Sequence, residues 1–462
     1  MSAAAAAPAP VPSEVDVVIV GAGFAGMYLL HRMRGQGMSA IVFEAGSDVG
    51  GTWYWNRYPG ARCDVESMQY SYSFDPKLEQ EWHWPEVFSA QPDILKYAQH
   101  VADRYDLRRD IRFNTRVAGA EYNTATRRWT VRTQNGATVS ARHCVMATGC
   151  LSSARKPDFP GMDSFKGETY HTGQWPHHKV SFAGKRVAVI GTGSSAIQSI
   201  PVIAEEAAQV TVFQRTPNFS IPTRNTVMTD AYEQSWKQDY RARRVAAREM
   251  RTGVLNDLNN KSALEVSEAE RKAEFEKRWQ IGVTSFMVSF NDLIVNKASN
   301  DTAAEFVRSK IKEMVKDPAK AEILAPKNHP IGTKRICVDS HYFETYNRPN
   351  VSLVDVSKAP IDRLTEKGLV TGGTEYEFDA IVFATGFDAM TGTLNAIDIR
   401  GKNGQKLKDK WEAGPRTYLG LMSEGFPNLF FITGPGSPSV LSNMMVSIEQ
   451  HVDWLTDCFL AA

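Results

Sequence analysis

The sequence predicts an α/β protein with two Rossmann-like dinucleotide-binding domains and an inserted helical subdomain. Two observations predict the domains: the order of apolar strand, glycine-rich turn, amphipathic helix and apolar strand occupies residues 15–45 and returns at residues 185–215. A third observation, the charged and glycine-poor composition of residues 226–330, predicts the helical part. With 462 residues, the chain is long enough for about two to four domains of ~150 residues each.

The first glycine-rich turn, GAGFAG, follows a strand of valine and isoleucine, which is typical of a parallel sheet covered on both faces. Gly21 permits a tight turn, Gly23 lets a pyrophosphate approach the backbone, and Gly26 lets the helix pack closely on the strand. The anion would lie at the helix N-terminus, where free N–H groups favour negative charge. Glu44 ends the next strand, where an acid binds ribose hydroxyls and repels a 2′-phosphate. This pattern favours FAD.

The second glycine-rich turn, GTGSSA at residues 191–196, has alanine in the third place, which the pattern permits. At the place equivalent to Glu44 the sequence reads Gln214-Arg215-Thr216, without an acid. A guanidinium and a hydroxyl suit a 2′-phosphate. The two turns together therefore predict FAD and NADPH bound to one chain, although Arg215 is also compatible with an ordinary surface residue.

The bulk composition excludes several other classes of protein. The formal net charge of +1 gives no general attraction to nucleic acid or to an anionic membrane, and the 23% charged and 42% hydrophobic residues are typical of a globular chain. Five scattered cysteines without a C-x-x-C pair argue against a disulfide scaffold or a zinc site, so no metal is expected. The N-terminus lacks a basic signal region, and no apolar run reaches the ~18 residues of a membrane span. We expect a cytoplasmic monomer or weak oligomer.

The inserted segment contains two matches to the capping box that begins a helix, Ser267-Glu-Ala-Glu270 and Thr302-Ala-Ala-Glu305. We interpret the insert as a packed structural cap with solvated charges. Later apolar strands, within residues 377–389 and in FPNLFFITG, should return to the earlier domains and complete the first sheet. The resulting boundaries are residues 1–150 and 388–462 for the FAD-binding domain, 151–225 and 331–387 for the NADP-binding domain, and 226–330 for the insert.

The stretch FKGETYHTGQWP lies between the two turns and is too aromatic for a plain loop and too broken for a helix or strand. It matches the fingerprint F-x-G-x-x-x-H-x-x-x-W-P at Phe165, Gly167, His171, Trp175 and Pro176. A second pattern, G-G-x-W-x4-Y-P-G-x3-D, fits residues 50–64 and ends at Asp64. On these motifs the chain resembles the class B flavin monooxygenases, and among them the type I Baeyer–Villiger monooxygenases such as phenylacetone and steroid monooxygenases. The resemblance implies that the fingerprint is a linker between the two domains, in which His171 is structural.

The resemblance further implies an FAD- and NADPH-dependent enzyme that inserts one oxygen atom of O2 next to a ketone carbonyl to give an ester or lactone. Reduced FAD would form a flavin peroxide that must stay deprotonated, which requires a permanent cation beside it. That catalytic role falls on Arg335 in the sequence IGTKRICVDS, and Asp64 would hold the arginine in place. The implied partners are a ketone and O2, with neither nucleic acid nor a membrane.

The resemblance also assigns binding residues. Near FAD it places Gly21, Gly23, Phe24, Gly26, Glu44, Thr52, Trp53, Tyr54, Trp55, Asp64, Tyr70, Val117 and Met444. Near NADP it places Arg62, Thr192, Gly193, Ser194, Ser195, Ala196, Ile197, Gln198, Arg215, Thr216, Lys334 and Arg335. Around the ketone it places Cys150, Leu151, Leu441, Ser442 and Met444, which implies an apolar and adaptable pocket.

Three alternatives stay open or are weakened at this point. An N- or S-oxygenating flavin monooxygenase has a related linker without the Trp-Pro ending, so Trp175 and Pro176 argue against it. A flavin disulfide reductase requires a paired-cysteine motif that the sequence lacks. The third alternative is an uncoupled FAD- and NADPH-binding flavoprotein, because family members continue for several dozen residues beyond the point that corresponds to Ala462.

Overall fold

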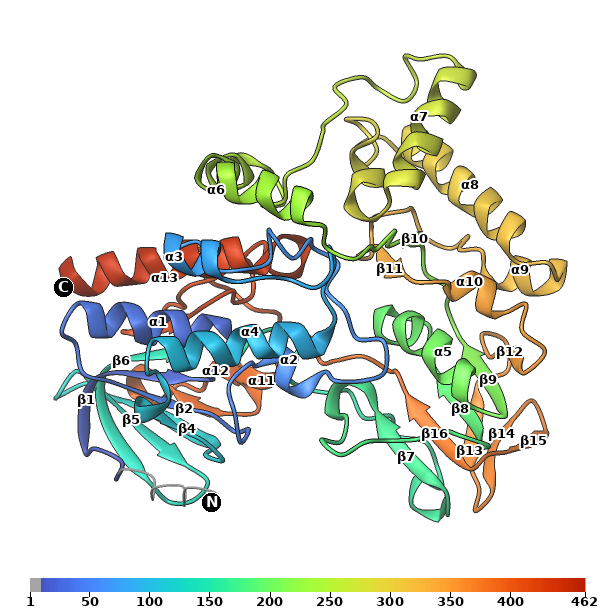
Figure 1. Cartoon of the computed structure of the whole chain (residues 1–462). Helices are drawn as coiled ribbons and strands as arrows, with labels where there is room; N and C mark the ends of the chain where they lie inside the picture. The colour runs from blue at the N-terminus through green and yellow to red at the C-terminus, as the bar shows by residue number, and fades with distance from the viewer. Residues whose placement is uncertain (1–9, 462) are drawn as a thin grey trace, which may run out of the picture.

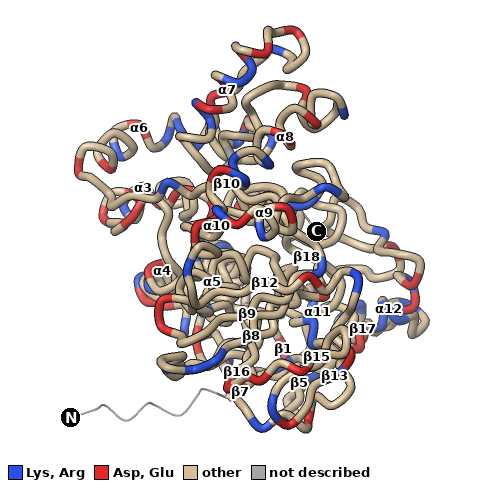
Figure 2. Tube along the Cα trace, turned by 90° about the vertical axis from the view of Figure 1, so that its right-hand side faces the viewer, with Lys and Arg blue, Asp and Glu red and all other residues tan. Residues whose placement is uncertain are grey.

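Two α/β units lie side by side in the computed structural model, which describes residues 10–461, and helices lie above them in the view of Figure 1. Each unit is organised around parallel strands that are followed by a helix. The predicted α/β class with two Rossmann-like units is therefore confirmed. Figure 2 shows basic and acidic residues intermixed along the chain, in keeping with the formal net charge of +1.

The first sheet contains eight strands. In spatial order they are β17 (Asp398–Arg400), β4 (Val117–Asn123), β5 (Arg128–Thr133), β6 (Thr138–Met146), β1 (Glu14–Val20), β2 (Ala40–Phe43) and β3 (Ile111–Arg112), with β18 (Leu429–Phe431) pairing with β6. Strands β17 and β18 pair in parallel with β4 and β6. The expectation that late segments complete the first sheet is thus confirmed for FPNLFFITG, which contains β18. It is wrong for residues 377–389, because Ala380–Phe383 forms a strand of the other parallel sheet.

Strand β1 is apolar on both faces because it separates two cores. Val17 and Ile19 face a core shared with α1 (Phe24–Gly35) and α13 (Met444–Ala461). Val18 and Val20 face the opposite core, which includes residues of β5 and β18. Alternate side chains of a strand point to opposite faces, so a central strand with a core on each side must be apolar throughout.

The remaining helices of this unit are short, except for one. They are α2 (Thr52–Trp55), α3 (Pro76–Glu81), α4 (Gln91–Arg104), α11 (Gly392–Asn395) and α12 (Leu407–Lys410), with 3₁₀ turns η1 (Arg108–Asp110), η5 (Lys402–Gly404) and η6 (Ser439–Leu441). Figure 1 shows α4 next to α1, and α3 above them next to α13. Helices α2, α3 and α4 pack in the same core as α1 and α13, whereas Leu394 of α11 and Leu407 of α12 belong to the core on the opposite face of the sheet.

The second unit has a parallel sheet of five strands. Its order is β12 (Val351–Asp355), β9 (Gln209–Gln214), β8 (Arg186–Ile190), β16 (Ala380–Phe383) and β7 (Glu168–His171). A three-stranded antiparallel sheet, β13 (Ile361–Leu364), β14 (Gly368–Thr371) and β15 (Thr374–Glu377), and a parallel pair, β10 (Ser220–Pro222) and β11 (Cys337–Asp339), accompany it. The helices are α5 (Ser194–Glu206) and α10 (Tyr342–Thr345), with 3₁₀ turns η2 (Met162–Ser164) and η3 (Thr172–Gln174).

The fingerprint stretch is not too broken for a strand, contrary to the expectation from its sequence. Residues Glu168–His171 form β7, the edge strand that pairs in parallel with β16. The reason is that an edge strand needs partners on one side only, so its short length is tolerated. Trp175 is buried and stacks on Tyr170 of this strand at 5.2 Å between ring centroids. The fingerprint is therefore part of the second unit.

The inserted helices are α6 (Asp230–Glu249), α7 (Glu268–Ile281), α8 (Lys297–Met314) and α9 (Pro318–Leu324), with the 3₁₀ segment η4 (Val283–Val288). They divide between the two units. Trp236 and Tyr240 of α6 join the core of the first unit, whereas Phe275 and Trp279 of α7 join the core of the second. Figure 1 shows this division, with α6 above α13, and with α7 and α8 higher in the view than β10 and β11.

Two expectations about the insert are wrong in part. Ser267 caps α7 as predicted, but Thr302 lies inside α8, whose N-cap is Asn296. The Thr302 hydroxyl donates to the carbonyl of Ser299, so the S/T-x-x-E pattern there reflects composition and no helix start. The charges are also not all solvated, because Arg244 and Arg278 are buried.

Buried His143 in β6 should make the fold sensitive to acid. Its side chain stacks on Phe459 at 4.2 Å between ring centroids, and among the described residues neither ring nitrogen has a hydrogen-bond partner. Burial lowers the pKa of His143 to about 4. A depressed pKa means that the unfolded chain binds the proton more tightly, so stability is full above pH ~6.5 and decreases as the pH falls toward ~4.

We therefore expect His143→Phe to flatten the acid side of the stability profile. The wild type should lose up to about 3 kcal/mol from this group between pH 6.5 and 4, whereas the variant should not. Urea unfolding at several pH values measures the difference. Parallel profiles for the two proteins would contradict the prediction.

Within residues 10–461, no helix combines the length and the apolar composition required to cross a membrane. The domain boundaries expected from the sequence stay a prediction. They agree with the division of strands between sheets, since the first sheet takes its strands from residues 14–146 and 398–431 and the second from residues 168–383.

Candidate active site

The first phosphate-type cradle is formed by the turn between β1 and α1. Gly21 has φ +106°, and a Cβ on it would lie 2.6 Å from the Ala147 carbonyl oxygen. A Cβ on Gly26 would lie 1.9 Å from the Gly21 carbonyl oxygen, so only glycine fits at either position. Gly23 precedes α1 without a side-chain cap, which leaves the first N–H groups of the helix directed at the turn.

Glu44 completes the first cradle from the end of β2. Its carboxylate accepts hydrogen bonds from the backbone N–H of Ala22 at 2.7 Å and of Gly46 at 2.6 Å. Burial raises the pKa of Glu44, although these hydrogen bonds and Arg116 act in the opposite direction. The side chain thus stabilises the turn itself, in addition to any contact with a ribose.

The second cradle, between β8 and α5, has the same geometry with one informative difference. Gly191 has φ +114°, and a Cβ on it would lie 2.5 Å from the Ala384 carbonyl oxygen. A Cβ on Gly193 would meet no described protein atom within 4 Å. The helix again starts without a side-chain cap. Gly193 therefore borders open space at a helix N-terminus, which is what a pyrophosphate requires.

The predicted residues of the second cradle do not all face this space. Ala196 and Ile197 are fully buried in the core, so only their backbone can contact a ligand. The Thr192 hydroxyl donates to the Thr216 carbonyl at 2.9 Å and ties the turn to the segment that contains Arg215. Arg215, Lys334 and Ser194 are exposed. Ser195 pairs with the Thr172 hydroxyl at 3.0 Å.

Gln198 connects the two units. Its side-chain oxygen accepts from the Tyr58 hydroxyl at 2.8 Å, and its amide donates to the Arg62 carbonyl at 3.1 Å. Gly60, with φ +78°, packs so closely that a Cβ would lie 2.2 Å from the Gln198 carbonyl oxygen. This joint fixes residues 58–62 of the first unit against α5 of the second, directly before Asp64 in sequence.

Arg335 and Asp64 form a bidentate ion pair across the two units. Arg335 Nε donates to Oδ2 at 2.9 Å, and Nη2 donates to both carboxylate oxygens at 2.7 Å. Burial alone would lower the pKa of Arg335, but Asp64 outweighs it and the pKa is raised, so the guanidinium stays charged. The Arg335 side chain is 40% exposed. Within residues 10–461, Nη1 has no hydrogen-bond partner.

Aromatic residues expected near a flavin surround the first cradle. The Trp53 indole N–H donates to the Tyr70 hydroxyl at 3.2 Å, and the two rings meet edge to face. Phe24 packs on Tyr70 at 6.1 Å between centroids and is buried. Gly51, before the exposed Thr52, approaches the cradle so closely that a Cβ on it would lie 2.8 Å from the Gly23 Cα. Gly51 thus contacts the turn directly, and Trp53 and Tyr70 are linked to it through Phe24 at the start of α1.

Other predicted residues are more scattered. Tyr54 and Trp55 contact His177, which directly follows the fingerprint, at 4.5 and 6.2 Å between ring centroids. Arg62 Nη1 donates to the Glu86 carboxylate and to the Phe88 carbonyl. Val117 is buried in the core of the first sheet, so only its backbone can face a ligand.

His171 is placed as a structural hydrogen-bonding residue. Its Nδ1 accepts from the Gly173 N–H at 3.0 Å, so Nε2 carries the proton, 3.2 Å from both the Arg155 carbonyl and the Thr385 hydroxyl. Burial lowers the pKa of His171, which favours this neutral tautomer. The ring joins β7 to the segments that lead into and out of the second sheet.

The predicted ketone-lining residues come from two segments. Leu441 is 67% exposed at the end of η6, and Ser442 and Met444 are partly buried at the start of α13. The Cys150 carbonyl accepts from the Met390 N–H at 2.9 Å, and Leu151 follows it.

Sequence reasoning missed the contribution of the insert. A cavity of about 420 Å³ has Asp64, Val65 and Gln69 of the first unit on one side. Its other side comes from Tyr232 of α6, residues 254–257 and residues 281–283. The insert therefore forms part of the surroundings of Asp64, and no motif marked these residues.

The arrangement fits two dinucleotides that meet near a fixed cation. The family model described as flavin-binding monooxygenase-like matches residues 14–319. A solved structure of oxidised steroid monooxygenase bound to NADP superposes with a TM-score of 0.94 at 56% identity, covering 97% of this chain and 86% of that chain.

Two curated relatives are similar over nearly the whole chain. A Baeyer–Villiger monooxygenase of Pseudooceanicola batsensis is 42% identical over 463 residues, covering 97% of this chain and 82% of that protein. A phenazine N-monooxygenase of Lysobacter antibioticus is 41% identical over 444 residues, covering 95% and 81%.

Proposed function

The chain belongs to the flavin-binding monooxygenase-like family, and we propose that it is a Baeyer–Villiger monooxygenase. It uses FAD, NADPH and O2 to insert one oxygen atom next to a ketone carbonyl, giving an ester or lactone. The observation that carries this proposal is the bidentate Arg335–Asp64 pair, which fixes a permanent cation where a residue of the first unit meets a residue of the second. A cation fixed before the reaction starts stabilises developing negative charge without reorganisation.

The first cradle would hold FAD. Its pyrophosphate would lie on the N-terminus of α1, and Glu44 would accept from ribose hydroxyls. The Trp53–Tyr70 pair would border the cofactor. When bound, FAD supplies the activation of O2 and the transfer of one oxygen atom, with electrons from NADPH. The second cradle would hold the NADPH pyrophosphate against the N-terminus of α5, with Arg215, Thr216 and Lys334 near the 2′-phosphate.

Arg335 and Asp64 have different roles in the proposed reaction. Arg335 would offer its positive charge and its unengaged Nη1 group to the reacting oxygen atoms. Asp64 keeps the guanidinium plane in one orientation, because two parallel hydrogen bonds restrict its rotation. Gln198 and Tyr58 maintain the distance between the units, and hence between the cradles. We further propose that Cys150, Leu151, Leu441, Ser442 and Met444 line the ketone site.

N-oxygenation is a second candidate activity. The Trp175-Pro176 ending of the fingerprint argues against it, but the relative from Lysobacter antibioticus carries the name of an N-monooxygenase at 41% identity. An electron-deficient ketone and a nucleophilic nitrogen require opposite polarity of the transferred oxygen, so a product assay separates them. The cytoplasmic location and the monomeric or weakly oligomeric state stay predictions.

Product analysis tests the proposal. The purified chain, supplied with FAD, NADPH and O2, is incubated with cyclic, aryl and steroid ketones and with phenazine, and products are identified by mass spectrometry. We expect esters or lactones that contain one atom of ¹⁸O from ¹⁸O2. N-oxides without any ester would favour the second candidate. NADPH consumption that yields hydrogen peroxide alone would indicate an uncoupled flavoprotein and contradict the proposal.

Arg215→Ala should weaken the binding of NADPH much more than the binding of NADH. The exposed guanidinium has a charge-assisted contact to offer a 2′-phosphate, worth roughly 1.5–3 kcal/mol, and NADH has no such group. The KM for NADPH should rise about 10- to 100-fold, measured by NADPH oxidation, with the KM for NADH nearly constant. Equal changes for both coenzymes would contradict the assignment of Arg215 to the phosphate.

A further inference from the structure

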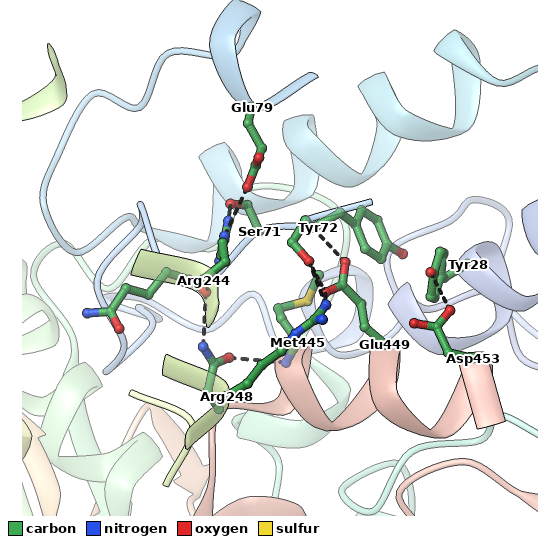
Figure 3. Close-up of polar contacts among 12 residues, drawn as sticks. Tyr28, Ser71, Tyr72, Glu79, Arg244, Arg248, Met445, Glu449 and Asp453 are labelled. Atoms are coloured by element: carbon green, nitrogen blue, oxygen red, sulfur yellow. Dashed lines mark hydrogen bonds and ion pairs between the residues drawn. The ribbon is translucent and has the colours of Figure 1, made fainter. Parts of the chain in front are cut away.

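Helix α6 of the insert is clamped onto the first unit by a buried arginine. Arg244 donates to Glu79 Oε1 at 2.9 Å, to the Gln69 carbonyl at 2.9 Å and to the Ser71 hydroxyl at 2.6 Å. Figure 3 shows Arg244 directed at Ser71 and Glu79, with Arg248 on the same helix directed at the carboxylate of Glu449. Three contacts from one buried guanidinium make a rigid connection, because its donors lie in one plane.

The Gln69 carbonyl accepts a hydrogen bond from Asn443 as well as from Arg244. Asn443 Nδ2 donates to the Gln69 carbonyl at 2.9 Å, and Asn443 is 1% exposed. Its side-chain oxygen accepts from the Met445 N–H at 3.1 Å at the first turn of α13. Asn443 lies between Ser442 and Met444, two residues that we assign to the ketone site. Gln69 itself precedes Tyr70, which we assign to FAD.

A second connection runs from the insert to the same point. The Asn443 N–H donates to the Thr252 carbonyl at 2.7 Å, just beyond the end of α6. Gly253, with φ +65°, lies so close that a Cβ on it would be 3.5 Å from the Asn443 Cβ. The Leu255 N–H donates to Gln69 Oε1 at 2.8 Å. The segment after α6 is therefore bonded to both Gln69 and Asn443.

We propose that Asn443 is a positioning residue that sets the ketone-lining loop, residues 439–444, relative to the FAD site, and that α6 holds it there through Arg244 and Gln69. This inference rests on the proposed ketone oxygenation. Its physical reason is the exposure of the loop: Leu441 is 67% exposed and can hold little by its own packing. The buried Asn443 amide at the end of the loop supplies hydrogen bonds that fix its position relative to Gln69 and α13. Helix α6 thus contributes to substrate selection.

Asn443→Ser tests this role. Serine still caps the first turn of α13 with its hydroxyl, but it lacks the amide that reaches Gln69. We expect the Kd and the KM for the ketone to rise about five- to tenfold, with kcat within about twofold, and the ratio of the two esters from an unsymmetrical ketone to change. The Kd is measured by calorimetry with the oxidised holoenzyme and NADP⁺. FAD content should stay that of the wild type.

Tyr28→Phe is a matched control on the same helix. The Tyr28 hydroxyl donates to Asp453 Oδ1 at 2.7 Å, also within Figure 3, so its loss removes one partly buried hydrogen bond from α13, more than two helical turns from the loop. It should lower thermal stability to a similar extent without a change in Kd or ester ratio. Arg244→Lys, which keeps a cation for Glu79 but cannot make all three contacts, should behave like Asn443→Ser.

Hydrogen exchange of residues 439–446 supplies a readout that does not depend on turnover. Deuterium uptake should rise in Asn443→Ser and Arg244→Lys and stay at the wild-type level in Tyr28→Phe. The proposal is overturned if Asn443→Ser lowers only the thermal stability, or if Arg244→Lys leaves the exchange of this segment unchanged. Failure of the wild type to form any ester would overturn the proposed function instead, and the exchange and the ketone Kd would still report on the positioning role.

Discussion

Replacing Arg335 by alanine is expected to abolish ester formation while leaving the reduction of FAD by NADPH intact. The variant removes the cation that Asp64 holds by two-point contact, and loss of a single group that stabilises developing negative charge typically costs about 10²–10³-fold in rate. Both nucleotide cradles remain, so NADPH should still be consumed. Anaerobic stopped-flow absorbance follows the reduction, and chromatography of the products follows the ester.

Two further variants separate charge from orientation at this position. Arg335→Lys keeps a cation but cannot form the two-point contact with Asp64, so we expect partial loss. Asp64→Asn keeps the shape of the partner and removes its charge, so the guanidinium should lose its fixed orientation. The expected order of ester yield is wild type, then either of these variants, then Arg335→Ala. Unchanged ester yield in Arg335→Ala would exclude the assigned role.

Features that depend only on residues close in sequence could be predicted without a structure. The two glycine turns, the strands beside them and the cap at Ser267 each follow from steric or hydrogen-bonding needs within a few residues. The same local reasoning was wrong at Thr302, because the S/T-x-x-E pattern is necessary for a capping box and does not by itself start a helix. It was also wrong for β7, whose four residues become a strand only because β16 pairs with them.

The site was predictable where a motif marked it and not where distant segments meet. Asp64 and Arg335 were paired through the family resemblance, and no pattern in the residues alone joins positions 271 apart. The Gln69 carbonyl receives Arg244 and Asn443 from 175 and 374 residues away, and a backbone carbonyl has no signature in a sequence. The burial of Arg244 could not be predicted from the sequence either, because the charged residues of such a helix are usually exposed to solvent.

The second large effect is expected at Gly193. Alanine there would place its Cβ in space that no described protein atom occupies within 4 Å, and the backbone angle of φ −84° suits any residue. Stability without coenzyme should therefore change by less than about 1 kcal/mol. If the NADPH pyrophosphate lies on this helix N-terminus, the methyl group occupies its place, and the KM for NADPH should rise about 10- to 100-fold. FAD content should not change.

Gly191→Ala is the control for Gly193→Ala, because alanine should destabilise the fold at the first position and obstruct the coenzyme at the second. At Gly191, where φ is +114°, the Cβ would lie 2.5 Å from the Ala384 carbonyl oxygen. The substitution should therefore lower the free energy of unfolding by about 2 kcal/mol or more. Thermal melts without coenzyme and NADPH titrations of both variants distinguish the two cases. A Gly193→Ala enzyme with the wild-type KM would show that the coenzyme pyrophosphate does not approach this turn, and would remove the second cradle from the mechanism. A raised KM with an unchanged melt would show that the open space at Gly193 belongs to the ligand.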